Sequence, residues 1–165
     1  MSNFTEEEDQ ELARLLTKVA ENEYHFPSQS YHVLEGVVSR WAPELVIIRG
    51  KEILLAVYDG GIKEFQGMWH IPGGRDYWPA PDMQANCSLV STREIGVDVE
   101  FIKVLDIYKW KTGEHPDGHP LSIYVECWLR GEVIETETLR FFSINNLPPV
   151  IVGVHERWIK SFFSR

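Results

Sequence analysis

The sequence predicts an α+β fold in which a mixed β-sheet lies between helices, with an additional helix at the N-terminus. Two observations support this fold class. Short apolar runs rich in Val and Ile flank glycine-containing turns in the middle of the chain, which is typical of strands. Segments with an apolar period of about 3.6 residues stand before, between and after these runs and predict helices. With 165 residues, the chain is long enough for one hydrophobic core.

The first 25 residues predict a helix. Thr5 is its expected cap, and acidic residues fill the first turn, where the helix dipole favours anions. Its apolar stripe consists of Leu12, Leu15, Leu16 and Val19. We expect residues 1–30 to form a helical extension and residues 31–165 the main domain. The stripe predicts packing against that domain or against a partner subunit, so a homodimer is one expected assembly.

Within the main domain, residues 45–48 and 53–57 flank a polar turn and predict a hairpin. Residues 69–71 predict a short strand that stops at Pro72-Gly73-Gly74. Asp82 is the expected N-cap of a helix over residues 83–95, and Gly96 ends it in the usual C-terminal glycine position. Further predicted elements are strands within 97–110, 121–129 and 139–143 and a helix over 154–163.

Composition and charge exclude several classes of function. The net charge of -9 argues against a broad nucleic-acid surface or an anionic-membrane binder, because both need positive charge. Two cysteines without paired spacing predict neither a disulfide framework nor a zinc site. The acidic N-terminus lacks an apolar signal region, and no apolar run is long enough to span a bilayer. We therefore expect a cytoplasmic protein.

The segment that carries chemistry runs from residue 69 to residue 99. Glycines after the short strand let a ligand or a metal ion approach main-chain carbonyls. On the following helix, one narrow stripe holds Met83, Cys87, Val90 and Glu94. The Glu94 carboxylate is therefore partly buried at the negative end of the helix dipole, where its charge needs compensation. A hard divalent cation such as Mg²⁺, an arginine or solvent would supply it.

This segment resembles the Nudix box, whose pattern is Gly, five residues, Glu, seven residues, Arg-Glu-aliphatic, any, Glu-Glu, any, Gly-aliphatic. The lead-in over residues 67–74 and the late strand and turn over 139–148 are also typical of the Nudix hydrolases. The resemblance covers roughly residues 43–163. It implies a Nudix-type α/β/α sandwich with a mixed sheet, and hydrolysis of a nucleoside diphosphate linked to another moiety.

The box in this chain is depleted. When Gly96 is the anchor, Glu94 alone stands in place among the family's four glutamates, and Arg93 precedes it. A second register aligns Arg93-Glu94-Ile95 with the Arg-Glu-aliphatic triplet but loses the terminal glycine. The depleted box is similar to that of the GDP-mannose mannosyl hydrolases, which use one metal ion. The resemblance implies that the Gly73 carbonyl and Glu94 hold Mg²⁺, with Mn²⁺ as an alternative, and that Arg75 contacts a phosphate.

The remaining expected site residues follow from this frame. Glu135 and Glu137 precede the late strand, where Nudix-like proteins often place a base, so they are the expected catalytic residues. A second pair of base candidates is His115 and His119. The expected substrate contacts are Arg93 to a phosphate and the rings Tyr77 and Trp78 to a base or a sugar.

Two functions from different classes fit this sequence. One is a Mg²⁺-dependent, single-metal hydrolase of a nucleoside diphosphate linked to another moiety, such as a nucleotide sugar. The other is a catalytically inactive Nudix-like domain that binds a nucleotide or a protein partner, because most box glutamates are missing.

Overall fold

The computed structural model describes residues 5–21, 30, 40–74, 80–116 and 120–164. The chain divides into two compact units, Met1–Leu34 and Glu35–Arg165. The predicted domain boundary after residue 30 stays a prediction. Within the described ranges, no helix combines the length and the apolar character that crossing a bilayer requires.

The described part of the first unit contains helix α1, which spans Glu6–Glu21. The Glu8 amide donates to Thr5 Oγ1 at 3.2 Å, and the Thr5 amide donates to Glu8 Oε2 at 2.7 Å. This reciprocal pair is a capping box, and it confirms the cap that the sequence predicts. Leu12, Leu15 and Leu16 are exposed on this helix, and their predicted packing partner stays a prediction.

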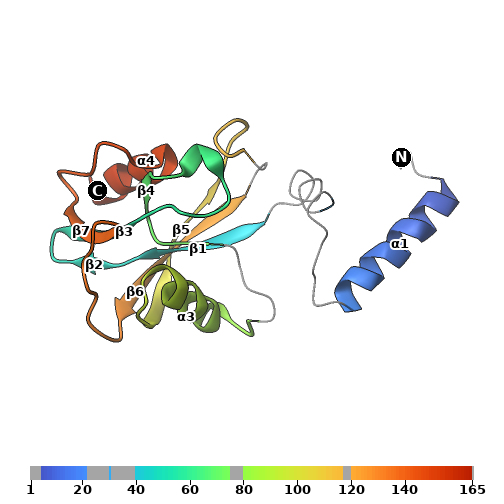
Figure 1. Ribbon diagram of the computed structural model, residues 1–165, viewed down its shortest axis with the longest axis horizontal. Coiled ribbons are helices and arrows are strands. Elements are labelled where there is room, and N and C mark those ends of the chain that lie inside the picture. Colours follow the sequence, from blue (N-terminus) through green and yellow to red (C-terminus); the bar gives the residue numbers. More distant parts are fainter. Residues whose placement is uncertain (1–4, 22–29, 31–39, 75–79, 117–119, 165) are drawn as a thin grey trace. The chain divides into compact units, whose positions relative to one another are not determined.

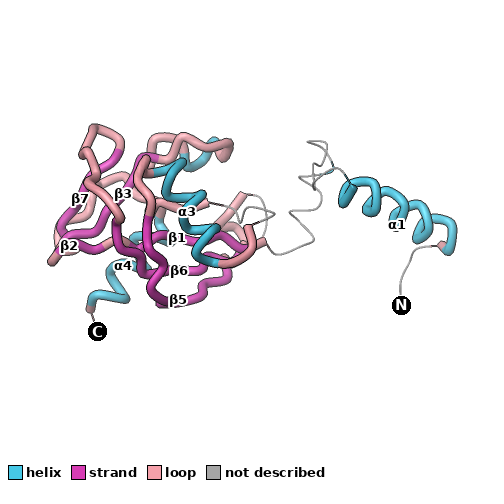
Figure 2. Tube along the Cα trace, turned by 90° about the horizontal axis from the view of Figure 1, so that it is seen from below, coloured by secondary structure: helices cyan, strands magenta, loops and turns pink. Residues whose placement is uncertain are grey.

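The second unit is built on two β-sheets (Figure 1). In the first sheet, β6 (Leu121–Leu129) lies in the centre, parallel to β1 (Trp41–Val46) and antiparallel to β5 (Val99–Lys109). Figure 2 shows these three strands side by side. The parallel pair makes this sheet mixed, as predicted.

The second sheet is antiparallel and centres on β3 (Glu52–Val57). Its neighbours are β2 (Ile48–Arg49), β4 (Trp69–His70) and β7 (Leu139–Ser143). Gly50, at φ 63°, closes the turn between β2 and β3 in the left-handed conformation that glycine adopts without strain. The predicted hairpin is confirmed at this turn, but its first strand is β2, and residues 45 and 46 of the predicted strand belong to β1 instead.

Helices α3 (Met83–Glu94) and α4 (Gly153–Phe163) lie on opposite faces of the sheets (Figure 1). Strand β3 serves both faces because its side chains alternate: Leu54 packs in the core with residues of α3, and Leu55 in the core with residues of α4. This arrangement is an α/β/α sandwich, which confirms the predicted fold class.

Strand β1 begins at Trp41, four residues before the predicted start at residue 45. Its register explains the difference, because Trp41 to Val46 pair with Leu121 to Glu126 of β6. The hairpin partner β3 instead meets the separate strand β2. The apolar pattern therefore predicted the hairpin, whereas the start of β1 depends on pairing with β6, a distant segment of the chain.

Two local features position the site. The Leu45 amide donates to the Pro72 carbonyl at 2.7 Å, and Glu44 forms a β-bridge with Gly73, so the glycine turn lies against β1. Helix α3 begins at Asp82, whose Oδ1 accepts from the Ala85 amide at 2.8 Å. Gly96 follows its last turn at φ 74°, as predicted. Glu94 is therefore the last residue of α3.

Candidate active site

The turn at Gly73 packs so closely against β1 that only glycine fits. A Cβ atom on Gly73 would lie 1.9 Å from Glu44 Oε2 and 3.0 Å from the Pro43 carbonyl oxygen. This close approach leaves the Gly73 carbonyl on the side of α3, where it accepts a hydrogen bond from Arg93 Nη2 at 3.2 Å. The absence of a side chain thus brings a carbonyl oxygen to the helix end.

Arg93 and Glu94 form the second half of the site. Arg93 Nε donates to Glu94 Oε1 at 2.6 Å, so one guanidinium contacts both groups that the resemblance assigns to a metal ion. Cys87 and Val90 are fully buried on the predicted stripe, and the Glu94 side chain is 14% exposed. Burial raises the pKa of Glu94, although the Arg93 guanidinium opposes this shift. Arginine is thus the compensating cation in this structure.

The buried ring of His70 lies next to the Glu94 carboxylate. Its Nε2 is 3.8 Å from Glu94 Oε2, is buried, and has no hydrogen-bond partner among the described residues. Burial lowers the pKa of His70 to about 4, so the ring is neutral at pH 7. The contact with Glu94 is therefore not an ion pair near neutral pH. Tyr58 packs on the ring at a centroid distance of 5.4 Å and helps to enclose it.

Glu44 is a buried carboxyl group beneath the glycine turn. Trp110 Nε1 donates to Ser122 Oγ at 2.9 Å, and Ser122 Oγ donates to Glu44 Oε1 at 2.8 Å. Burial raises the pKa of Glu44 to about 8, and the nearby charge of Glu94 adds to the shift. The group is therefore largely protonated at pH 7.

The buried side chain of His155, on α4, lies next to Glu44. Its Nδ1 accepts from the Ile71 amide at 3.0 Å, which assigns the ring proton to Nε2. That Nε2 lies 3.7 Å from Glu44 Oε1. The β4 strand, the glycine turn and α4 are thus joined through one buried polar cluster, consisting of Glu44, His70, Ser122 and His155.

The predicted base candidates Glu135 and Glu137 lie in the loop before β7. Glu135 Oε1 accepts from Arg49 at 3.1 Å and its Oε2 from the Phe141 amide at 3.2 Å. Together these contacts lower the pKa of Glu135. Glu137 is exposed. Neither has a described contact with Gly73, Arg93 or Glu94, and their catalytic role stays a prediction.

The other predicted residues divide into two groups. His115 packs against Phe65 and Trp110, at centroid distances of 5.7 and 5.0 Å. Four predicted site residues lie outside the described ranges: Arg75, Tyr77, Trp78 and His119.

Four residues near this site were not predicted from the sequence: Glu44, Asp59, His70 and His155. Asp59 is an exposed carboxylate whose charge acts on both His70 and Glu94. One sequence signal was available: Glu44 and His70 are polar residues within apolar strand patterns, and such residues need a buried partner. Their meeting point, however, depends on strand pairing.

Gly73 and Glu94 offer a carbonyl and one carboxylate to a divalent ion. No three His, Cys, Asp or Glu side chains within the described ranges are grouped to hold a metal. Mg²⁺ typically uses one or two carboxylates together with water and substrate phosphates. The oxygen donors present fit an ion of this kind if a phosphate ligand completes its coordination.

No family model and no curated protein sequence matches this chain. Solved structures do match its fold. A MutT Nudix hydrolase from Burkholderia pseudomallei is 21% identical with a TM-score of 0.62, over 74% of this chain and 97% of that one. An ADP-ribose pyrophosphatase from Streptococcus suis is 24% identical with a TM-score of 0.56, over 78% and 93%. A UDP-X diphosphatase is 18% identical with a TM-score of 0.62, over 98% and 84%. The chain therefore has the Nudix fold.

Proposed function

We propose that the Glu35–Arg165 unit is a hydrolase that cleaves a nucleoside diphosphate linked to another moiety, such as a nucleotide sugar. One observation carries this proposal: Gly73, Arg93 and Glu94 meet at the end of α3, where the resemblance expects a diphosphate to bind. Two proteins of similar fold are named for such substrates, an ADP-ribose pyrophosphatase and a UDP-X diphosphatase.

Each residue of this group has a chemical role in the proposal. The Arg93 guanidinium presents a planar fork of N–H donors that suits phosphate oxygens. Glu94 and the Gly73 carbonyl would hold Mg²⁺, with Mn²⁺ as the alternative ion. When bound, that ion would neutralise diphosphate charge and act as a Lewis acid. Arg75 remains a proposed second phosphate contact, and Tyr77 and Trp78 remain proposed stacking partners.

The hydrolysis also needs a group that accepts a proton from water. We propose Asp59 for this role, because it is exposed and follows Tyr58, whose ring packs on His70 at 5.4 Å, and His70 Nε2 lies 3.8 Å from Glu94 Oε2. Glu135 and Glu137 remain alternative bases. The Arg49 and Phe141 contacts hold the pKa of Glu135 below its ordinary value, which makes that carboxylate a weaker base.

The test is a turnover assay on ADP-ribose, nucleoside diphosphate sugars and dinucleotides with Mg²⁺ or Mn²⁺. We expect cleavage of at least one substrate class, and a loss of about 100-fold or more in Glu94→Gln. Arg130→Ala is the matched control, because Arg130 is exposed and pairs with Asp98. Turnover that survives unaltered in Glu94→Gln would show that the site is assigned wrongly.

A second function is binding without turnover. The observation that favours it is that Arg93 engages both oxygens that the resemblance assigns to the metal ion. It predicts thermal stabilisation by nucleoside diphosphates with no product formed. The same substrate panel decides between the two, since cleavage of any member excludes a purely binding role.

A further inference from the structure

We propose that Arg93 is the resident cation of this site in the ligand-free protein and that it keeps a divalent ion out until a diphosphate binds. This inference rests on the proposed function of the site. It adds an order of events: the divalent ion and the diphosphate enter together, and Arg93 moves from protein oxygens to a phosphate.

The position of the Arg93 guanidinium supports this proposal. Arg93 Nε lies 2.6 Å from Glu94 Oε1, and Nη2 lies 3.2 Å from the Gly73 carbonyl oxygen. One planar group therefore contacts both oxygens that a divalent ion would use. The guanidinium also occupies the space beside Gly74, since a Cβ atom there would lie 2.1 Å from Arg93 Nη2. The glycine turn thus forms a cradle for this cation.

Charge balance at the site supports the same order of events. Arg93 balances the charge of Glu94, whose side chain is only 14% exposed. A divalent ion added alone to this pair would leave an excess of positive charge, which the carboxylate of Asp59 offsets only in part. A diphosphate brings roughly two negative charges, which together with the charge of Glu94 balance the guanidinium and the ion. Charge therefore favours joint entry over entry of the metal alone.

Arg93 is also accessible to a ligand from solvent. Its side chain is 47% exposed, whereas that of Glu94 is largely covered. A phosphate in solvent can therefore reach the guanidinium, whose fork suits phosphate oxygens. Exchange of the protein oxygens for phosphate oxygens would release the Glu94 carboxylate and the Gly73 carbonyl to an ion.

The test measures Mn²⁺ binding to the full chain without any turnover. Water proton relaxation reports Mn²⁺ held by the protein, for wild type, Arg93→Ala and Arg130→Ala, each with and without ADP. We expect Arg93→Ala alone to bind Mn²⁺ at least ~10-fold more tightly than wild type, and ADP to raise wild-type Mn²⁺ affinity by at least ~10-fold. Arg130→Ala should match wild type. Arg93→Lys keeps the charge but not the fork, so its affinity should lie between.

The outcomes separate this inference from the proposed function. Equal Mn²⁺ affinity in wild type and Arg93→Ala overturns the resident cation and leaves the hydrolase standing. If Arg93→Ala binds Mn²⁺ more tightly but the wild type shows neither ADP binding nor turnover, the hydrolase and joint entry fail and the resident cation stands. Arg93→Met keeps the side-chain length and repeats the test if Arg93→Ala does not fold.

Discussion

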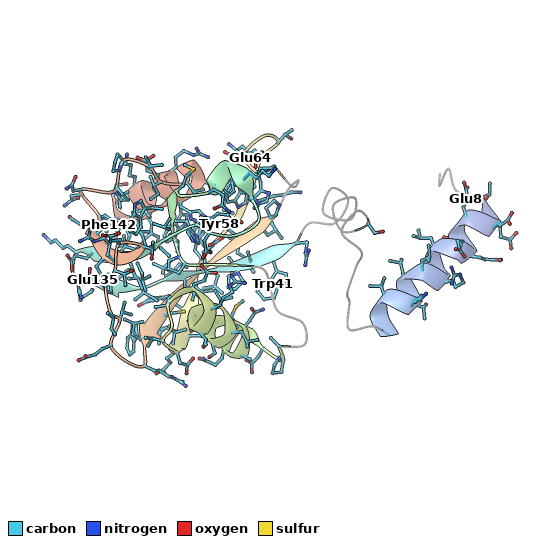
Figure 3. The ribbon with its side chains drawn as sticks, viewed as in Figure 1. Glu8, Trp41, Tyr58, Glu64, Glu135 and Phe142 are labelled. Atoms are coloured by element: carbon cyan, nitrogen blue, oxygen red, sulfur yellow. The ribbon has the colours of Figure 1, made fainter. Side chains whose placement is uncertain are left out.

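Two arginine–glutamate clusters in this molecule use the same chemical groups in different surroundings. At the end of α3, Arg93 pairs with Glu94 beside buried His70 and Glu44. At the β2–β3 hairpin, Arg49 pairs with Glu52 and Glu135, at 3.0 and 3.1 Å. Glu135 and Trp41 lie at opposite ends of the second unit (Figure 3).

Burial separates the two clusters. The Glu94 side chain is 14% exposed, whereas those of Glu52 and Glu135 are 42% and 37% exposed. Water screens the hairpin cluster, so its charges have little effect on a ligand or on stability. The Glu94 charge acts in a poorly solvated position, where a cation or a phosphate is felt more strongly. An arginine–glutamate pair alone therefore does not distinguish the proposed site, whereas the burial of its carboxylate does.

The proton acceptor gives the largest difference that we expect between the two regions. We expect Asp59→Asn to lower kcat by about 100-fold, which is typical of a lost general base. Glu135→Gln should change kcat by less than about 3-fold, because its contacts run to Arg49 and Phe141. Rates on the best substrate of the panel measure both, with Glu137→Gln as the third member. A large loss of kcat in Glu135→Gln and none in Asp59→Asn would mean that Glu135, and not Asp59, is the general base.

The next effect concerns two adjacent glycines with different neighbours. A methyl group on Gly73 would meet Glu44, which Ser122 holds in place, so Gly73→Ala should destabilise the fold by about 1–3 kcal/mol. A methyl group on Gly74 would meet the end of a flexible side chain, Arg93. Gly74→Ala should therefore cost less than about 1 kcal/mol. Urea unfolding measures the free energy of unfolding of both variants. Equal losses of stability would contradict the expected difference between a rigid neighbour at Gly73 and a flexible neighbour at Gly74.

A smaller effect appears in the pH dependence of stability. Burial raises the pKa of Glu44 from 4.5 to about 8, so the folded chain keeps a proton that the unfolded chain releases. This contribution is present below pH 4.5 and is lost as pH rises toward 8. Burial lowers the pKa of His70 from 6.5 to about 4, which gives the opposite slope between those values.

Above pH 6.5, Glu44 is therefore the dominant buried group of the two. We expect the free energy of unfolding to fall by roughly 1 kcal/mol per pH unit between about pH 6.5 and 8. Glu44→Gln should flatten this slope, and the exposed control Glu132→Gln should retain it. Denaturant titrations at several pH values measure the slope. A slope that Glu44→Gln leaves unchanged would mean that Glu44 is not the titrating group.

Much of the fold was predictable because its signals are local. Asp82 and Gly96 mark the ends of α3 through contacts within a few residues, and the turn at Gly50 is equally local. The start of β1 at Trp41 was not predictable, because it depends on pairing with β6. Helix caps and turn glycines can be predicted from neighbouring residues, whereas the partner of a strand cannot.

The site divides in the same way. Gly73, Arg93 and Glu94 could be named from the motif, and the structure brings these three together. Glu44, His70 and His155 become neighbours only when β1, β4 and α4 pack, so their grouping lies beyond a single sequence. The position of Glu44 within the apolar β1 strand is a sequence signal, because a buried carboxylate needs a polar partner.

The smallest expected effect tests the hairpin cluster. Arg49 lies over the Phe141 ring at 3.9 Å and contacts two carboxylates, but its side chain is 57% exposed. Arg49→Ala should therefore shift the melting temperature by no more than ~2 °C and leave Mn²⁺ binding unchanged. Scanning calorimetry with Arg130→Ala as the control measures this shift. A much larger loss would mean that Arg49 contributes more by covering Phe141 than by its charge, and the two clusters would then differ in packing as well as in burial.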